Sequence, residues 1–234
     1  MEAGQRVLDV GSGVGDVAML VARIVGPSGR VVAVERDPSS TSRAQARAAE
    51  AGLENIEFVR ADIDEYATNE SFDAAVGRYV LQFLPDPVST LRSVARLVRP
   101  GGIVAFQEGS WAPFVALSAR VPLWGSAISL LHEAGVRNGV NLEMGIELHR
   151  AFQEAGLPAP RMRLEMELGC DPDFTRWASD TVESVLPQIE RLDLSCEALG
   201  NLETLAERLQ DEVAGAGTVV PWIGLVGAWC RKPS

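Results

Sequence analysis

The segment Asp9-Val10-Gly11-Ser12-Gly13-Val14-Gly15 constrains the fold more than any other part of the chain. It follows a compact apolar run, Arg6–Val10, which predicts a β-strand, and it precedes Asp16–Val25, whose apolar residues recur at helical spacing. Glycines allow a tight turn and a close approach of the backbone to a ligand. A strand, a glycine turn and a helix in this order are typical of an open α/β sheet, in which ligands collect at such turns.

The first half of the chain continues with the same alternation. An Asp37-Pro38 pair predicts the start of an Ala-rich helix that runs to about Ala51, and a further helix is expected at Pro87–Val98, ending before Pro100-Gly101-Gly102. Short runs rich in β-branched residues predict four more strands at Arg30–Glu35, Asn55–Arg60, Ser71–Gly77 and Ile103–Gln107. Five strands joined by helices or long crossovers describe a doubly wound sheet.

The second half is less regular and contains more helix. Two further strands are expected at Arg161–Leu168 and Trp222–Arg231. Helical patterns cover Phe114–Gly135 (interrupted by Pro122), Gly145–Ala155, Phe174–Ile189 and Leu202–Val213. We therefore expect an α/β fold with a mostly parallel, doubly wound, Rossmann-like sheet of seven strands and a helical cap inserted after strand five. No linker is visible, so we expect one domain over residues 1–234, with a cofactor-binding half (1–109) and an acceptor-binding half (110–234).

Composition excludes several classes of partner. Lys and Arg number 21 against 32 Asp and Glu, which gives a net charge of −11 and disfavours nucleic acid or anionic lipid as a partner. The three cysteines, Cys170, Cys196 and Cys230, have no metal-ligand or disulfide spacing, so no metal is expected. No apolar run is long enough to span a membrane, and no signal sequence is visible, so a cytoplasmic location is expected by default. The composition does not decide between a monomer and a homodimer.

Charge near the glycine turn favours one cofactor class over another. Glu35 ends the second strand, 20 residues after Gly15, where a carboxylate can accept hydrogen bonds from ribose hydroxyls. A dinucleotide prefers GxGxxG with its pyrophosphate at the helix N-terminus, whereas this chain has GxGxG followed by Asp16. Asp9 and Asp16 disfavour a pyrophosphate and suit a cofactor that carries an ammonium and a sulfonium. S-adenosylmethionine is therefore favoured over NAD.

The glycine segment resembles motif I of the class I S-adenosylmethionine-dependent methyltransferases. Other segments resemble the family's later motifs in order and spacing, over about residues 6–109: Val34-Glu35-Arg36-Asp37, Arg60-Ala61-Asp62-Ile63, Phe72-Asp73-Ala74-Ala75-Val76-Gly77-Arg78 and Leu97-Val98-Arg99-Pro100-Gly101-Gly102. The chain is most similar to the small-molecule group related to the ubiquinone and menaquinone C-methylating enzymes. The resemblance implies S-adenosyl-L-methionine as cofactor and methyl transfer to a small, apolar or aromatic metabolite.

The resemblance also implies roles for individual residues. Glu35 would hold the ribose with Arg36 beside the adenine, and Asp62 and Ile63 would face the adenine edge. The residues at the aminoacid and sulfur end would be Asp9, Gly11, Ser12, Gly13, Gly15, Gly77, Arg78 and Gln82. Arg78 has an equally weighted alternative, which is an ion pair with a nearby acid.

The acceptor side has weaker signals. A phenol or alcohol acceptor benefits from a general base, and His132 is the candidate we favour, with His149 and Glu108 as further candidates. Trp111, Phe114 and Trp124 would line an apolar acceptor pocket, although aromatic residues at helical spacing are more often core residues. The Asp/Asn-Pro-Pro-Tyr/Phe motif of nucleic-acid amino-methylating enzymes is absent after strand four, which favours a small-molecule acceptor.

Three alternatives compete with methyl transfer. They are a protein that binds the cofactor without catalysis, a cyclase-like enzyme that uses the cofactor's charge, and an NAD-dependent dehydrogenase. The resemblance is also incomplete, because relatives usually carry one or two helices before the first strand and only five residues precede it here. We expect either that the start is truncated or that later helices cover the site, and that added upstream residues would tighten cofactor binding.

Overall fold

A computed structural model describes residues 1–233 of the chain. Contacts between Cα atoms divide it into two compact units. Unit 1 contains Met1–Glu108, Gly145–Arg163 and the chain from Val226, and unit 2 contains Gly109–Met144 and Leu164–Leu225. The expectation of a single domain stays a prediction.

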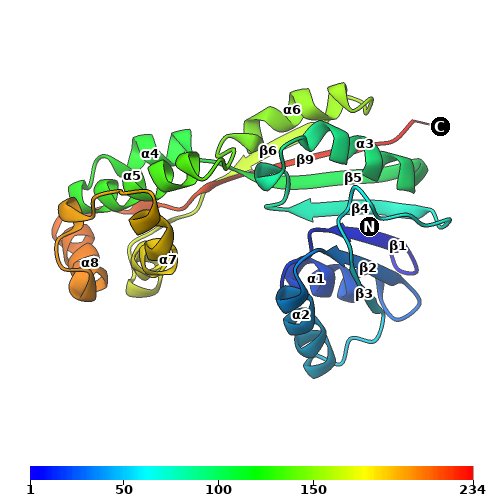
Figure 1. Cartoon of the computed structure of the whole chain (residues 1–234), viewed down its shortest axis with the longest axis horizontal. Helices are drawn as coiled ribbons and strands as arrows, with labels where there is room; N and C mark the ends of the chain where they lie inside the picture. The colour runs from blue at the N-terminus through cyan, green and yellow to red at the C-terminus, as the bar shows by residue number, and fades with distance from the viewer. Residues whose placement is uncertain (234) are drawn as a thin grey trace. The chain divides into compact units, whose positions relative to one another are not determined.

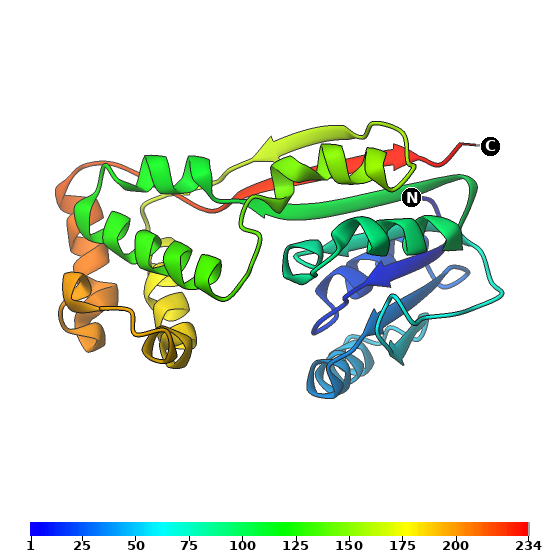
Figure 2. The ribbon, with the colours of Figure 1, turned by 45° about the horizontal axis from the view of Figure 1, so that its top comes forward.

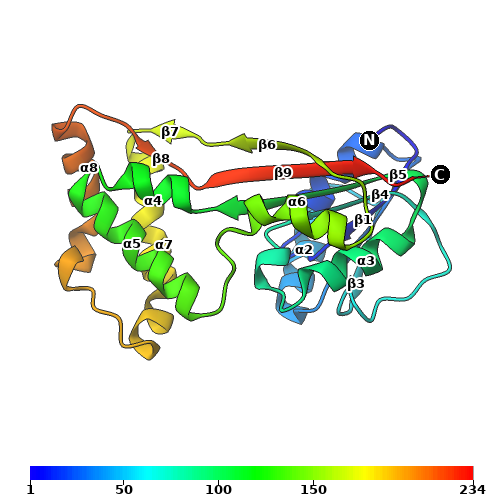
Figure 3. The same ribbon diagram turned by 90° about the horizontal axis from the view of Figure 1, so that it is seen from above.

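The predicted α/β fold is confirmed: a seven-stranded sheet has the order β3-β2-β1-β4-β5-β9-β6, and β1 to β5 pair in parallel (Figure 1). The strands are β1 (Arg6–Val10), β2 (Arg30–Glu35), β3 (Ile56–Arg60), β4 (Phe72–Arg78), β5 (Val98–Ser110), β6 (Arg161–Glu165) and β9 (Gly224–Arg231). β9 lies between β5 and β6 in the sheet and beside both in Figure 3. The sheet places the ends of β1, β2 and β4 at one edge, as a doubly wound sheet requires.

The helices of unit 1 start at signals that are readable in the sequence. They are α1 (Asp16–Val25), α2 (Pro38–Glu50), α3 (Pro87–Leu97), with the short 3₁₀ helix η1 (Leu81–Phe83) before it, and α6 (Met144–Glu154). The Asp37 side chain accepts a hydrogen bond from Ser40 N (2.6 Å), and Asp86 accepts one from Ser89 N (2.9 Å). In both cases a proline follows the capping aspartate, because its missing N–H is not needed in the first turn. Figure 2 shows α3 and α6 beside the β5 part of the sheet, and α2 near β3.

Unit 2 is mainly helical. It contains α4 (Ala112–Ser118), α5 (Pro122–Arg137), α7 (Pro172–Arg191) and α8 (Leu205–Gly215), with the short 3₁₀ helices η2 (Glu197–Leu199) and η3 (Leu202–Thr204). Their apolar faces form one core, whose largest fully buried side chains include Trp124, Phe114 and Ile128. Two strands of two residues each, β7 (Leu168–Gly169) and β8 (Val220–Pro221), pair antiparallel in the same unit. Helices thus follow strand five as expected, while their role as a cap stays a prediction.

Two predicted boundaries are wrong, both because pairing extends beyond the local pattern. Strand five was expected at Ile103–Gln107, but β5 begins at Val98 and includes Pro100 and Gly101. The chain end holds this stretch, since Gly101 N donates to Lys232 O (2.9 Å) and Lys232 N donates to Gly102 O (2.8 Å). The strand expected at Arg161–Leu168 is interrupted, because β6 ends at Glu165 and Leu168 pairs in a separate sheet.

Candidate functional site

The glycine turn after β1 adopts backbone angles that favour glycine. Gly11, Gly13 and Gly15 have φ of 62°, 53° and 87°. A Cβ atom at Gly11 would lie 2.6 Å from Cγ2 of Val80, so a side chain at this position would collide with its neighbour. Ser12 N donates to Val34 O (3.1 Å), which ties the turn to the end of β2. The turn therefore contacts both the carboxyl end of β2 and the chain that follows β4.

Glu35 joins this turn to the start of the next helix. Its Oε2 accepts a hydrogen bond from Gly13 N (2.9 Å), and its Oε1 accepts one from Asp37 N (2.8 Å). Each carboxylate oxygen has a second lone pair, so the side chain can still accept hydrogen bonds from ribose hydroxyls. Glu35 is thus a structural part of the turn as well as a candidate ligand-binding residue.

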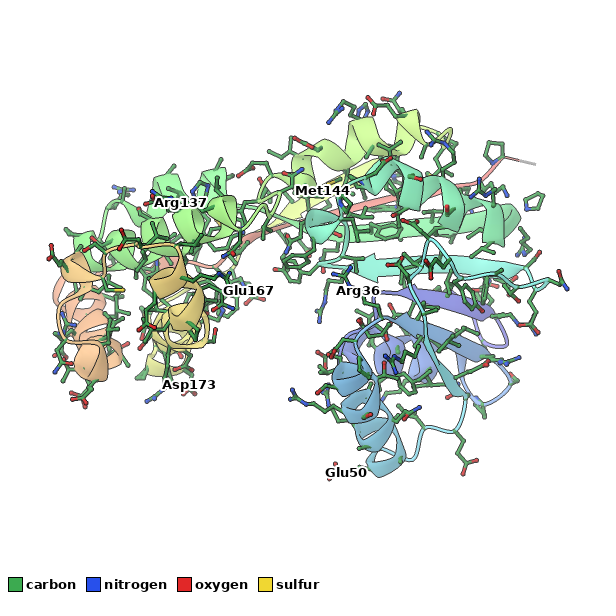
Figure 4. All side chains as sticks on the ribbon, in the orientation of Figure 1. Arg36, Glu50, Arg137, Met144, Glu167 and Asp173 are labelled. Atoms are coloured by element: carbon green, nitrogen blue, oxygen red, sulfur yellow. The ribbon has the colours of Figure 1, made fainter. Side chains whose placement is uncertain are left out.

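A cavity of about 180 Å³ opens beside the turn, within unit 1. It brings together five of the residues expected to bind the cofactor: Gly11, Glu35, Arg36, Asp62 and Ile63. Figure 4 shows Arg36 between the end of β2 and the start of α2, whose other end carries Glu50. The other expected residues, which are Asp9, Ser12, Gly13, Gly15, Gly77, Arg78 and Gln82, do not line this cavity.

Sequence reasoning missed one wall of the cavity. Tyr79, Val80, Phe83 and Leu84, in the chain between β4 and α3, line it as well. A signal existed, because this segment follows β4 directly and β4 pairs with β1 in the sheet. In the sequence its apolar residues look like ordinary core residues, and only the fold brings this segment into contact with the glycine turn.

A larger hollow of about 720 Å³ lies elsewhere in unit 1, lined by residues such as Gly26, Arg30 and Asn55. It is found near the start of β2, whereas the glycine turn lies near its end. Ligands in doubly wound sheets bind outside the carboxyl ends of the strands. Position therefore outweighs size, and the smaller cavity is the candidate site.

Several buried oxygen atoms around the turn have no hydrogen-bond partner among residues 1–233. They are Asp9 Oδ2, Ser12 Oγ, Gln82 Oε1 and Glu108 Oε2. Burial raises the pKa of Asp9 to about 8, a shift that the hydrogen bond from the Ala18 backbone and the charge of Arg78 oppose. Buried polar atoms are rarely left unpaired, so such atoms suit a ligand that brings donors or positive charge. This set of acceptor oxygens therefore fits a cofactor with an ammonium and a sulfonium.

Arg78 and Gly77, expected at the methionyl end of the cofactor, have other structural roles. Nη2 of Arg78 lies 3.9 Å from Oδ2 of Asp16, which is the ion pair considered as its alternative. Both side chains are about half exposed, so this pair contributes little to stability. A Cβ at Gly77 would lie 2.4 Å from Cε1 of Phe106, so close packing by itself explains the glycine. Their contact with a cofactor stays a prediction.

Comparison with known proteins identifies the family. A family model described as a methyltransferase domain matches residues 1–156, two thirds of the chain. The chain belongs to this family. Membership confirms the sequence-based identification as a class I S-adenosylmethionine-dependent methyltransferase, a family whose cofactor is S-adenosyl-L-methionine.

Relatives of this methyltransferase domain differ in the reactions that their names describe. It is 34% identical over 109 residues to an arsenite methyltransferase of Halobacterium salinarum, covering 46% of this chain and 28% of that protein. It is 31% identical over 121 residues to the ubiquinone/menaquinone biosynthesis C-methyltransferase UbiE of Coxiella burnetii, covering 51% of this chain and 48% of that protein. The chain thus spans half or less of the length of these two curated relatives.

A solved structure matches over the whole chain. A candidate methyltransferase of Bacillus halodurans superposes with a TM-score of 0.65 and 19% identity, covering 100% of this chain and 95% of that one. At this identity the match supports the fold alone. Together with the seven-stranded sheet it confirms the Rossmann-like architecture expected from the sequence.

The residues expected on the acceptor side of the methyltransferase domain lie in unit 2. The centroid of the His132 ring, on α5, is 6.1 Å from that of Trp111, and Trp111 lies 5.4 Å from Phe114. Phe114 and Trp124 have no exposed surface, and Trp124 Nε1 donates to Ser118 Oγ (3.2 Å). Because both side chains are fully buried, Phe114 and Trp124 are core residues. The structure thus groups His132 with Trp111 and Phe114, while roles in catalysis or acceptor binding stay predictions.

Within residues 1–233, no group of three or more His, Cys, Asp and Glu side chains is arranged to hold a metal ion. No helix in that range has the length and apolar character needed to cross a membrane.

Proposed function

We propose that this protein transfers a methyl group from S-adenosyl-L-methionine to a small-molecule acceptor. One observation carries the proposal: the cavity beside the glycine turn is lined together by Glu35, Arg36, Asp62 and Ile63, which come from two separate segments of the chain, at the end of β2 and after β3. The acidic surface, with a net charge of −11, supports a small molecule rather than a nucleic acid as the acceptor. A cytoplasmic location is part of the same proposal.

The residues of the cavity would hold the cofactor by complementary chemistry. Glu35 would accept hydrogen bonds from the ribose, while Asp62 and Ile63 would contact the adenine edge and Arg36 would lie beside it. The unpaired oxygens of Asp9, Ser12 and Gln82 would face the cationic end, with Gly11, Gly13 and Gly15 allowing close approach and Gly77 and Arg78 nearby. The bound cofactor supplies a methyl group activated by the sulfonium, and the chain supplies alignment and exclusion of water.

The acceptor would be small and apolar or aromatic. His132 is the group we propose as a base for an acceptor that must lose a proton, and the neighbouring ring of Trp111 would contact an apolar acceptor. Phe114 and Trp124 would support that surface from within the core. Replacement of His132 by Asn is expected to lower kcat for a phenol or alcohol acceptor without weakening S-adenosylhomocysteine binding.

Calorimetry and labelled-methyl transfer would test the proposal. We expect the protein to bind S-adenosylhomocysteine in preference to NAD, and Glu35→Gln to weaken this binding. Glu57→Gln is the matched control, because Glu57 forms an exposed ion pair with Arg30 and lines no part of the candidate cavity. Incubation with a metabolite panel and methyl-labelled cofactor should add one methyl to an acceptor, as read by mass spectrometry. Binding without transfer across a broad panel would favour the non-catalytic or cyclase-like alternative.

A further inference from the structure

The cavity wall that sequence reasoning missed is a strained segment, Tyr79–Leu84. Four of its six side chains line the cavity. Its first residue, Tyr79, has φ of 55°, a left-handed conformation that costs a non-glycine residue about 1–2 kcal/mol. Such a conformation persists only where neighbouring structure determines it. Neighbouring groups must therefore hold this wall segment in place.

The end of β5 holds three successive amides of the wall segment. Tyr79 N donates to Gln107 O (3.0 Å), and Val80 N and Leu81 N donate to Oε1 of Glu108 (3.0 and 2.9 Å). Glu108 is completely buried and lies 28 residues from Val80 in the sequence. Its side chain therefore supplies the one non-backbone acceptor in this set of three bonds.

The wall segment is also in contact with the glycine turn. Val80 fills the space beside Gly11, where an added Cβ would lie 2.6 Å from Cγ2 and 3.0 Å from Cγ1 of Val80. Loss of the bond from Val80 N would therefore release both a wall of the cavity and the side chain that packs on the turn. Glu108 itself does not line the cavity.

The electrostatics of Glu108 agree with a holding role. Burial raises its pKa to about 7, while the hydrogen bonds from the backbone of Leu81, Val80 and Gln82 oppose the shift by favouring the charged form. Both amides donate to Oε1, which keeps two lone pairs whether or not Oε2 carries a proton. The side chain can therefore hold the wall segment in either protonation state.

We propose that Glu108 is a positioning residue that shapes the cofactor cavity by holding Val80 and Leu81 in place. This inference rests on the proposed function, because it assumes that the cavity binds S-adenosylmethionine. It differs from the role of general base considered from the sequence, since the carboxylate here acts on the backbone of the chain.

Two substitutions separate this role from general loss of stability. Glu108→Leu removes the acceptor at nearly constant volume, whereas Glu108→Gln keeps a carbonyl oxygen that can accept the same two bonds. Calorimetry with S-adenosylhomocysteine should give an affinity about tenfold or more weaker for Glu108→Leu and within about threefold of wild type for Glu108→Gln. Amide hydrogen exchange of the unliganded proteins should accelerate at Tyr79–Leu84 in the Leu variant, and much less in the Gln variant.

Glu212→Gln is the matched control. Glu212 also accepts hydrogen bonds from two successive amides, those of Leu123 and Trp124 at the start of α5, and it lines no part of the cavity. We expect its substitution to leave S-adenosylhomocysteine affinity unchanged.

Three results would overturn the inference: wild-type affinity in Glu108→Leu, equal losses in the Leu and Gln variants, or faster exchange spread evenly over unit 1. Absence of binding by the wild-type protein would instead count against the proposed function. In that case the exchange pattern of the unliganded Glu108→Leu and Glu108→Gln proteins still decides whether Glu108 holds the wall segment.

Discussion

At the residue scale, Gly11 and Gly13 have similar backbone angles but very different surroundings. Both have positive φ, of 62° and 53°, but a Cβ at Gly11 meets Val80 at 2.6 Å whereas one at Gly13 has no neighbour within 4 Å. Gly13→Ala should cost only backbone strain, about 1–2 kcal/mol, and Gly11→Ala should add overpacking of about 1–3 kcal/mol. Urea unfolding of the two variants checks this, and equal losses of stability would contradict it.

Asp9 should make the protein less stable as pH rises. The folded state keeps its proton up to about pH 8, because burial raises the pKa of Asp9 from 3.8, whereas the unfolded chain releases it near pH 4. The folded state therefore binds more protons between these values, and its stabilisation is present in full below pH 4 and lost as pH rises towards 8. Unfolding free energies measured between pH 4.5 and 8 should fall in the wild type and fall less in Asp9→Asn.

Subtracting the Asp9→Asn stability profile from the wild-type profile isolates the contribution of Asp9. Glu108 contributes in the same direction, since burial raises its pKa to about 7, and it is present in both proteins. The difference between the wild-type and Asp9→Asn profiles should therefore change by up to about 1.4 kcal/mol per pH unit. Parallel profiles would show that Asp9 is already ionised in the folded state.

At the scale of elements, the single lysine of the chain closes the end of α3. The Lys232 ammonium donates to the carbonyl oxygens of Ala95 (2.8 Å) and Val98 (2.7 Å), which are near the last turn of the helix. A cation at this position satisfies orphan carbonyls and interacts favourably with the helix dipole. The end of a helix expected from the sequence is thus bonded by a residue more than 130 positions away.

Lys232→Met should lower the free energy of unfolding by about 1 kcal/mol, because it removes both side-chain bonds and leaves the backbone pairing of residue 232 with Gly101 and Gly102. Arg231→Met is the control, since Arg231 is exposed and donates a single bond, to Gly101 O (3.1 Å). Chemical unfolding should give a smaller change for the control. Equal changes would mean that the helix end does not depend on the lysine.

At the scale of the whole molecule, the two units should respond separately to damage in their cores. Leu91 in α3 and Leu209 in α8 are both completely buried, in unit 1 and unit 2 respectively. Substitution of either by Ala should cost about 2–5 kcal/mol. Hydrogen exchange should accelerate mainly within the unit that carries the substitution, because each unit has its own contacts. Uniform acceleration over the chain would favour the single cooperative domain expected from the sequence.

Local patterns in the sequence predicted most elements of unit 1. β1 and α1 have the expected bounds, because apolar periodicity and the glycine turn are local signals. The strand at Val98–Gly102 was missed, because its pairing with Lys232 is non-local and Pro100 and Gly101 locally indicate a turn. The grouping of Glu35 with Asp62 was predictable, since parallel strands end at one edge of the sheet.

The sequence by itself determined the family and the sheet, and it predicted segments that line the candidate cavity, because spacing along the chain records how a strand, a glycine turn and a helix follow one another. Only the tertiary structure decided that Tyr79–Leu84 forms a wall of the cavity, that Glu108 accepts hydrogen bonds from two of its amides, and that Phe114 and Trp124 are buried. The reason is physical: burial and hydrogen bonding between residues far apart in the chain depend on which elements pack together. These long-range contacts leave no periodic pattern in a single sequence.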